Sequence, residues 1–370
     1  MINNLRFLKN KIKCSQWKIL SKFASFKGNK IPVKFIIENA DWAIKFVGDN
    51  IKREIDIIAP SKLELSAKPY RFTENVVHFG SQYMWLNWYK HMANENHFIT
   101  SFFHGKPEDG EEVKIHIDSF LNSVERLDKV VTASSLMEDR LLKWGVPQHK
   151  LVRIPLGVNT SLFNFPLANQ KQSVREFLGI PKDKILIGSF QKDGSGWKDG
   201  LDPKFIKGPD LFVSTLKLLS SKGYQVYALL TGPARGYVKR ELEKCGIPYF
   251  HTYLKNHNDL ISLYHALDIY LITSREEGGP MGLLESIACG TPVASTNVGM
   301  AADIIEDKIT GVLAEQIDVE IIAKKIEYLI NMSNQQKKVL KIKARKVVEN
   351  FDWSIVAKEH LEKIYIPLIN

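Results

Sequence analysis

Cysteine is scarce in this sequence. It occurs at three of the 370 positions, Cys14, Cys245 and Cys289, which lie far apart. An odd number of scattered cysteines provides neither a disulfide framework nor the paired spacing of a zinc site, and it argues for a reducing cytosol. The sequence also lacks an apolar run long enough to span a bilayer, and lysines interrupt the apolar N-terminal region too often for a signal peptide. We therefore expect a cytoplasmic protein.

Acidic residues are missing from the N-terminal region. No Asp or Glu precedes Glu38, whereas residues 1–34 contain nine Lys or Arg, which account for all but one unit of the net charge of +10. A nucleic-acid enzyme would spread its basic residues through the fold, so we expect no nucleic acid partner. Bulky apolar residues such as Trp17 and Phe23 lie among these cations, which suits peripheral binding to the inner face of an anionic membrane. A basic helix packed on the protein is the open alternative.

Strand-like apolar runs alternate with helical patterns along the chain. This alternation predicts parallel sheets covered by helices on both faces. The length exceeds what one hydrophobic core usually serves, and residues 166–173, "PLANQKQS", have the composition of a linker. We therefore predict an α/β protein with two doubly wound halves. The strand-like runs are residues 33–37, 75–79, 97–103, 129–134, 184–190, 224–232 and 268–274.

One short stretch of the second half has the composition of a binding site. A buried strand, residues 268–274, leads into the loop 275–280 and then into a short helix that Gly290 ends. Ligands of open α/β sheets bind at such strand ends, and a glycine-flanked helix start attracts anions. Glu277 in the loop and Glu285 in the helix can accept hydrogen bonds from sugar or ribose hydroxyls. The alternative gives Glu277 a helix-dipole role and Glu285 a solvated face.

The same stretch, "REEGGPMGLLESIACGTPVAS", resembles the Glu-x7-Glu signature of retaining nucleotide-sugar glycosyltransferases with the GT-B fold, of the family-four type. The resemblance implies two Rossmann-like domains: an acceptor-side domain at 1–167 and a nucleotide-sugar-binding domain at 168–350. A final helix at 351–370 would cross back to the first domain. The resemblance begins near residue 97 and is weak before it. Further similar segments are residues 151–163, 229–247, 260–274, 297–313 and 351–368.

The resemblance also implies roles for individual residues. Glu285 matches the glutamate that holds the ribose hydroxyls, and Glu277 matches the one that contacts the transferred sugar. Lys207, in "IKGPDLF", matches the lysine that neutralises the diphosphate, and a surface lysine at a helix start is its alternative reading. The backbone N–H groups expected to face the diphosphate or the sugar are those of Gly278, Gly279, Met281 and Gly282.

Two family positions near the donor correspond to Ser189 and His104 in this chain. Ser189 stands where the family usually has an arginine of the donor site, and a long polar, glycine-rich insertion follows it. Lys192 in that insertion is a candidate for the missing cation, while a merely solvated lysine is the alternative. His104 follows the strand-like run 97–103, where the family often has a histidine near the donor. A structural histidine is the alternative there.

The reaction implied by the resemblance is transfer of a sugar, with retention of configuration, from a nucleotide-sugar donor to a glycan or lipid-linked acceptor. Such a hexosyltransferase would build surface polysaccharide, lipopolysaccharide or glycolipid. The sequence has no Asp-x-Asp pair, so we expect no metal and no other cofactor. Two alternatives remain: a catalytically silent sugar- or nucleotide-binding protein of this fold, and another enzyme on Rossmann-like domains. A dinucleotide oxidoreductase is disfavoured, because Gly-x-Gly-x-x-Gly is missing after a first strand.

Overall fold

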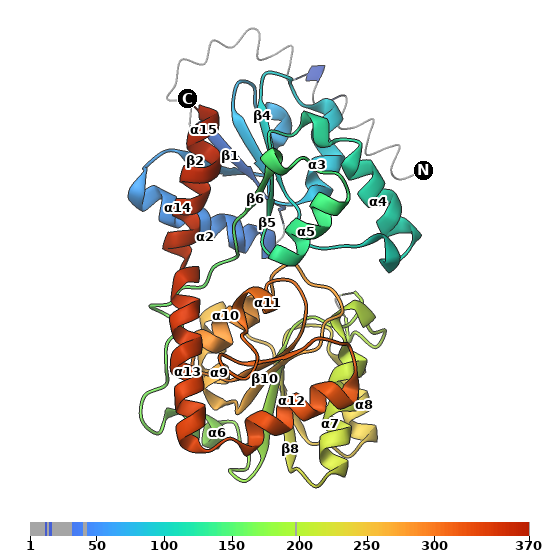
Figure 1. Ribbon diagram of the computed structural model, residues 1–370, viewed down its shortest axis with the longest axis vertical. Helices are drawn as coiled ribbons and strands as arrows, with labels where there is room; N and C mark the ends of the chain where they lie inside the picture. The colour runs from blue at the N-terminus through green and yellow to red at the C-terminus, as the bar shows by residue number, and fades with distance from the viewer. Residues whose placement is uncertain (1–11, 13–14, 17–31, 40–42, 197, 370) are drawn as a thin grey trace. The chain divides into compact units, whose positions relative to one another are not determined.

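The computed structural model describes residues 12, 15–16, 32–39, 43–196 and 198–369. It divides into two compact units (Figure 1): unit 1 comprises Met1–Leu156 and Trp353–Asn370, and unit 2 comprises Gly157–Asp352. Most of the basic segment 1–34 lies outside the described residues, so its two alternatives both stay predictions. No helix in the described part of the chain has the length and hydropathy needed to cross a membrane.

Unit 1 is built on a six-stranded parallel sheet with the order β2-β1-β3-β4-β5-β6. Hydroxyl caps start two of its helices: Ser81 accepts from the backbone N–H of Met84, and Ser134 accepts from that of Met137. The strands are β1 (Val33–Ile36), β2 (Leu63–Ser66), β3 (Val76–Phe79), β4 (His97–Ser101), β5 (Lys129–Thr132) and β6 (Leu151–Arg153). The main helices are α2 (Ala43–Ile58), α3 (Gln82–Trp88), α4 (Glu111–Leu121) and α5 (Ser135–Lys143).

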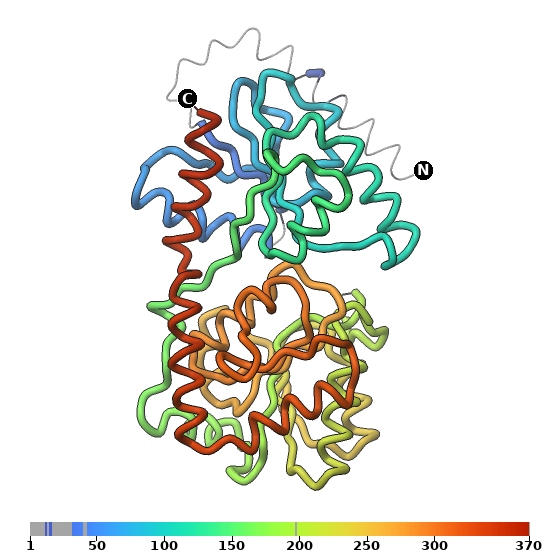
Figure 2. Tube along the Cα trace, in the orientation of Figure 1, coloured from blue at the N-terminus to red at the C-terminus, as the bar shows by residue number. Residues whose placement is uncertain are grey.

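The C-terminal segment returns to unit 1, as the tube in Figure 2 shows. It consists of α14 (Trp353–His360), a π-helical turn η9 (Leu361–Tyr365) and α15 (Ile366–Ile369). Helix α14 packs along α2, where the buried Trp353 meets Phe46 edge-on at 6.3 Å between ring centroids. The predicted return of the last helix to the first domain is therefore confirmed.

A buried histidine joins this segment to the sheet. His78 on β3 is fully buried, and its Nδ1 lies 2.8 Å from the hydroxyl of Tyr365. Its Nε2 lies 3.0 Å from Oγ of Ser101 on β4. Burial, and then the neighbouring His360, hold the pKa of His78 well below its usual value, so the ring is neutral. The two ring nitrogens thus connect the C-terminal segment with two central strands.

We expect Tyr365→Phe to destabilise unit 1 by about 1–3 kcal/mol, because the buried His78 nitrogen loses its partner while the aromatic packing is kept. Urea unfolding measures the change. The matched control is Tyr83→Phe, at an exposed ring that stacks on His116 in the same unit. Equal stabilities for the two variants would contradict the proposed role of this hydrogen bond.

Unit 2 has a second six-stranded parallel sheet, in the order β12-β11-β10-β7-β8-β9. From β7, the chain adds β8 and β9 on one side of the sheet and then returns to add β10, β11 and β12 on the other side. The boundary between β7 and β10 is therefore the topological switch point of a doubly wound sheet. The strands are β7 (Ile185–Phe190), β8 (Val226–Thr231), β9 (Tyr249–Thr252), β10 (Ile269–Ile272), β11 (Val293–Thr296) and β12 (Val312–Ala314). The predicted pair of doubly wound sheets is confirmed.

Helices cover both faces of the second sheet. Helices α7, α8 and α12 contact one another or the strands on one side, and α6, α9, α10 and α13 form the second group. Strand residues such as Ile187 and Leu230 and helix residues such as Phe212 and Ile326 form a continuous buried core. The helices are α6 (Gln170–Phe177), α7 (Pro209–Ser221), α8 (Gly236–Lys244), α9 (Leu260–Ala266), α10 (Met281–Ala288), α11 (Ala301–Ile304), α12 (Val319–Asn331) and α13 (Asn334–Val348).

The change from unit 1 to unit 2 lies between Leu156 and Gly157, ahead of the predicted linker at 166–173. Part of that predicted linker belongs to helix α6, which packs on α9. Arg175 of α6 is buried and donates from Nε to the carbonyl of Ala266 at 2.8 Å. The polar composition of residues 166–173 thus predicted a linker, but tertiary contacts hold part of this segment in a helix.

Candidate functional site

The switch point of unit 2 brings two loops together. One follows β7 and leads through a short 3-10 turn, Phe205–Lys207, into α7. The other follows β10 and leads into α10. Because β7 and β10 are parallel neighbours, both loops leave the same edge of the sheet. This edge is where open α/β sheets bind their ligands.

A glycine allows the two loops to touch. Gly208 has φ +64°, and a Cβ on it would lie 1.8 Å from the carbonyl oxygen of Thr273. Its own carbonyl accepts a hydrogen bond from the Thr273 hydroxyl at 2.8 Å. Next to this contact, the guanidinium of Arg275 donates to both carboxylate oxygens of Asp210 at 2.8 and 2.7 Å. Only a residue without a side chain can occupy position 208 in this arrangement.

Two predicted site residues meet at this contact. Nζ of Lys207 lies 2.6 Å from Oε1 of Glu277. The same carboxylate oxygen accepts from the hydroxyl of Ser274 at 3.0 Å. The Lys207 and Glu277 side chains keep 31% and 14% of their surface exposed, so the pair borders solvent. The fold thus joins a cation and a carboxylate that lie far apart in the sequence.

Helix α10 begins directly after the Glu277 loop. Pro280 precedes the helix and provides no capping hydrogen bond from a side chain. The backbone N–H groups of Met281 and Gly282 in the first turn therefore have no capping side chain as an acceptor. A Cβ on Gly282 would lie 2.3 Å from the hydroxyl of Tyr270, which explains the small residue there. The predicted glycines 278 and 279 form the turn between Glu277 and this helix start.

Glu285 lies one turn further into α10 and is buried, with 4% of its surface exposed. Its Oε1 lies 2.7 Å from Nε2 of His257, and its Oε2 accepts from the hydroxyl of Tyr264 at 2.9 Å. The alternative of a solvated surface glutamate is therefore wrong. Burial lowers the pKa of His257, but the hydrogen bond and charge of Glu285 outweigh burial and raise it overall.

The sequence reasoning missed His257 and Tyr264. They lie on η7 (His257–Asp259) and α9, separated by about two helical turns, and therefore share a face. That spacing was readable in the sequence, but only the fold places this face against Glu285. Tyr264 is fully buried, and burial followed by the Glu285 charge raises its pKa well above the usual value.

Ser189 is buried on β7, where Arg235 from the loop between β8 and α8 contacts it. The guanidinium of Arg235 donates to the Ser189 carbonyl at 2.6 Å and to its hydroxyl at 3.2 Å. Nε of Arg235 also lies 3.0 Å from the buried carboxylate of Asp193. Burial lowers the pKa of Arg235 and raises that of Asp193, and the mutual attraction opposes both shifts. The guanidinium is thus committed to a buried pair, and donor binding by Ser189 stays a prediction.

The insertion after β7 is packed against α8. Asp199 and Gly200 accept, through their carbonyls, from the backbone N–H groups of Gly236 and Tyr237 at 2.6 and 2.9 Å. These bonds satisfy the first donors of α8. Lys192 stands at the start of the insertion, and burial followed by the charge of Lys204 lowers its pKa. The backbone contacts with α8 therefore fix part of the insertion that contains Lys192.

His104 belongs to unit 1, whereas the other predicted site residues belong to unit 2. It is exposed and follows the last residue of β4, Ser101. Its carbonyl accepts from the side-chain amide of Gln82 at 3.4 Å. Its role stays a prediction. Within the described part of the chain, no three His, Cys, Asp or Glu side chains are grouped in a way that could hold a metal ion.

Comparison with solved structures supports the architecture. HepE of Anabaena, solved with UDP and glucose, aligns with 90% of this chain and 99% of its own at a TM-score of 0.70 and 15% identity. Sucrose-phosphate synthase of Thermosynechococcus elongatus aligns with 91% of this chain and 98% of its own at a TM-score of 0.73 and 16% identity. The chain has the GT-B fold. At these identities the likeness concerns the fold alone.

Sequence comparison extends this result. Residues 201–347, within unit 2 of the GT-B fold, match the model of the glycosyl transferases group 1 family. An uncharacterized glycosyltransferase of Methanocaldococcus jannaschii is 22% identical over 66% of this chain and 61% of its own. The capsular polysaccharide biosynthesis glycosyltransferase CapM of Staphylococcus aureus is 29% identical over 43% of this chain and 42% of its own.

A third relative is the lipopolysaccharide core biosynthesis mannosyltransferase LpsB of Rhizobium meliloti. It is 27% identical over 49% of this chain and 49% of its own. The chain thus spans about half the length of the curated relatives it matches, with aligned shares of 61%, 42% and 49%. These relatives are glycosyltransferases by name, and the match to the glycosyl transferases group 1 model lies within the second unit.

The His257–Glu285 pair should make stability depend on pH. Because the folded pKa of His257 is raised, its stabilisation is fully present below the unfolded pKa and is lost as pH rises through the folded pKa. We expect His257→Gln to cost about 0.5–1 kcal/mol at pH about 5.5 and less at pH about 8.5, since the ring is partly exposed. Urea unfolding at both pH values measures this, with the exposed His149→Gln as control. A larger cost at the higher pH would contradict the assignment.

Proposed function

We propose that the protein transfers a sugar, with retention of configuration, from a nucleotide-sugar donor to a glycan or lipid-linked acceptor. The observation that carries the proposal is the Lys207–Glu277 pair at the switch point. The loop that contains Glu277 leads directly into α10, the helix that contains the buried Glu285. This arrangement places a cation, a carboxylate and a helix N-terminus at one strand end. A phosphorylated, hydroxyl-rich ligand needs these three groups together.

The donor would lie along the start of α10. Glu285 would accept hydrogen bonds from the ribose hydroxyls, held in position by His257 and Tyr264. The N–H groups of the loop and of Met281 and Gly282 would face the diphosphate, together with the ammonium of Lys207. A lysine and a helix N-terminus can stabilise the negative charge that develops on the leaving diphosphate. No metal ion is required for this role.

The transfer step breaks the bond between the anomeric carbon and the diphosphate oxygen and forms a bond to the acceptor oxygen. In a front-face route, the leaving diphosphate takes the acceptor proton, so charge and atoms balance. Glu277 would contact the transferred sugar and hold Lys207 beside the leaving group. Lys192 is the second candidate cation, and His104 is a candidate on the acceptor-side unit. Exclusion of water from the bound donor would protect it from hydrolysis.

The names of the relatives support a place in surface glycan synthesis. CapM is named for capsular polysaccharide biosynthesis and LpsB for lipopolysaccharide core biosynthesis. Such acceptors are large and often lipid-linked, which fits a cytoplasmic enzyme that works at the membrane face. The basic segment 1–34 would provide the attraction to anionic lipid.

Glu285→Gln should weaken binding of UDP, the nucleotide bound by the HepE structure, by roughly 10- to 150-fold. The reason is that hydrogen bonds to a charged acceptor contribute about 1.5–3 kcal/mol. Calorimetry with UDP, GDP, dTDP and ADP identifies the base and measures the loss. Glu320→Gln, at an exposed glutamate of α12, is the matched control. Unchanged affinity in a folded Glu285→Gln protein, for a nucleotide that the wild type binds, would refute the ribose role.

Lys207→Ala should lower kcat by about 100-fold or more, as loss of a charge-stabilising donor usually does. Lys192→Ala should have a smaller effect, and the exposed Lys217→Ala on α7 should have none. Glu277→Gln should reduce turnover of the intact donor more than binding of the free diphosphate. Release of nucleoside diphosphate from a panel of nucleotide sugars measures these rates. Loss of activity in EDTA that a divalent ion restores would overturn the metal-free mechanism, and binding without turnover would favour a silent protein.

A further inference from the structure

A basic cavity lies in unit 2, outside the candidate donor site. Its volume is about 260 Å³, far more than the roughly 10–15 Å³ that one water requires. Apolar residues such as Leu329 and Pro292 form part of its wall. Among the lining residues that the structure describes, Asp268 is the single carboxylate. The cationic lining residues are Lys171, Arg175, Lys182, Lys184, Lys337 and Lys341.

The cavity lies at the amino ends of the strands. Its lining includes Ile185 and Ile269, the first residues of β7 and β10. The Lys207–Glu277 pair follows the carboxyl ends of the same two strands. A six-residue strand such as β7 extends over roughly 20 Å. The cavity therefore belongs to the opposite edge of the sheet and is not part of the proposed donor site.

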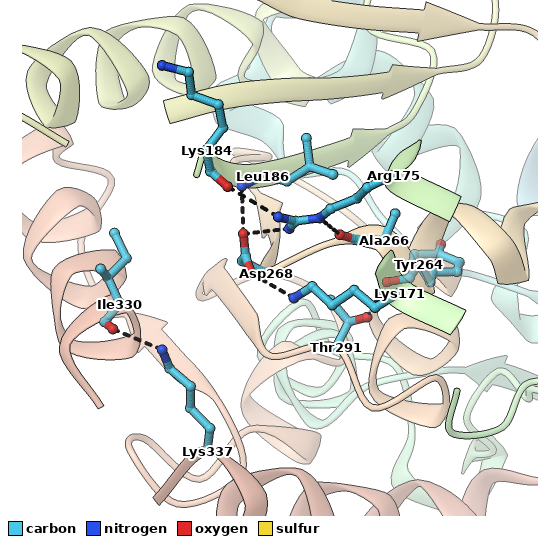
Figure 3. A network of polar contacts seen from close by, with 10 residues as sticks. All are labelled: Lys171, Arg175, Lys184, Leu186, Tyr264, Ala266, Asp268, Thr291, Ile330 and Lys337. Carbon is cyan, nitrogen blue, oxygen red and sulfur yellow. Dashed lines mark hydrogen bonds and ion pairs between the residues drawn. The ribbon is translucent and has the colours of Figure 1, made fainter. Parts of the chain in front are cut away.

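The single carboxylate is already saturated, as Figure 3 shows. Asp268 accepts from Nζ of Lys171 at 2.6 Å, from the guanidinium of Arg175 at 2.7 Å and from the backbone N–H of Leu186 at 2.8 Å. It offsets one of the six positive charges of the lining. Asp268 thus fixes α6 to β7 and β10 and leaves an excess of positive charge in the lining.

Helix α13 contributes two of the unbalanced cations. Lys337 donates to the carbonyl of Ile330 at 2.9 Å, a neutral acceptor that is also drawn in Figure 3. Within the described residues, neither Lys337 nor Lys341 forms an ion pair, whereas Lys182 pairs with Glu176 at 2.7 Å and Lys184 with Asp183 at 3.7 Å. Lys337 and Lys341 are one helical turn apart, so their like charges destabilise each other.

The directions of the pKa shifts of Lys171 and Lys341 agree with this picture. Burial lowers the pKa of Lys171, and the ion pair with Asp268 does not fully reverse the shift. Burial and then the charge of Lys171 lower the pKa of Lys341, and Lys337 adds to both shifts. A bound anion would offset this repulsion and favour the charged ammonium groups.

We propose that this cavity binds a small multivalent phosphate, either the free anion, such as inorganic phosphate or diphosphate, or the phosphate group of a small organic ester. Several lysine point charges around one space suit a compact anion of high charge. The guanidinium of Arg175 is buried and committed to Asp268 and Ala266. The ammonium of Lys171 has N–H donors beyond its bond to Asp268, so Lys171 of α6 and the lysines of α13 would be the ligands. The bound anion would link α6 with α13 across the amino ends of β7 and β10. This inference does not depend on the proposed transferase activity.

Calorimetry with sodium diphosphate, at constant ionic strength, tests the proposal on the full chain. The variant Lys337→Gln/Lys341→Gln removes two lining charges, and Lys338→Gln/Lys343→Gln removes two exposed charges of the same helix as the matched control. We expect the lining variant to bind at least about tenfold more weakly, which corresponds to about 1.4 kcal/mol. The control variant should keep the wild-type affinity, and Lys207→Ala, which acts on the proposed donor site alone, should keep the binding that the lining variant loses. Diphosphate should raise the melting temperature of the wild type and of Lys207→Ala by more than that of the lining variant.

Three results would overturn the proposal: no binding to the wild type, equal weakening by the lining and control variants, or loss of all binding in Lys207→Ala. The single variant Lys341→Gln, with an expected smaller loss, serves if the double variant does not fold. Inorganic phosphate and glycerol 3-phosphate, titrated in parallel, distinguish the two sources. Tighter binding of the ester identifies an organic phosphate, and tighter binding of the inorganic anion identifies the free ion.

Discussion

The candidate site depends on one backbone contact, between Gly208 and Thr273. A side chain at position 208 would overlap the Thr273 carbonyl, so this glycine decides how closely the start of α7 approaches the end of β10. That approach places the ammonium of Lys207 within 2.6 Å of the Glu277 carboxylate. The Arg275–Asp210 pair then fastens the same two segments from the side. The charged pair is thus a consequence of a steric constraint in the backbone.

In the described part of unit 2, the buried charged groups around the site have hydrogen-bonding or charged partners. Glu285 is surrounded by the hydrogen bonds of His257 and Tyr264. Arg235 and Asp193 are both almost fully buried and face each other. A buried charge without a partner is strongly destabilising, so each partner must be placed as accurately as the charge itself. These partners hold the Glu285 carboxylate one turn into α10 and hold Asp193 of the insertion against Arg235.

Much of this arrangement could be predicted from the sequence, because it is local. The strand, glycine turn and helix around Glu277 are coded within one stretch, and alternation of strands and helices indicated the two parallel sheets. The partners could not be predicted in this way. His257, Arg235 and Tyr365 act on residues that are distant in sequence, and nothing in their neighbourhoods indicates which buried group they face. The predicted linker also failed for this reason, since Arg175 makes α6 part of unit 2 through contacts near residue 268.

The lysines at the two ends of the second sheet differ in whether a carboxylate is present to pair with them. At the carboxyl ends, Lys207 has Glu277 as a partner, so the pair can exist without a ligand and still offer its cation to one. At the amino ends, Asp268 is shared by Lys171 and Arg175, and the lysines of α13 have no such partner in the described chain. The apolar packing of α12 and α13 on the core must offset the repulsion between these lysines. The unbalanced cluster at the amino ends of this sheet therefore either lowers the stability of unit 2 or relies on a bound anion to remove the repulsion.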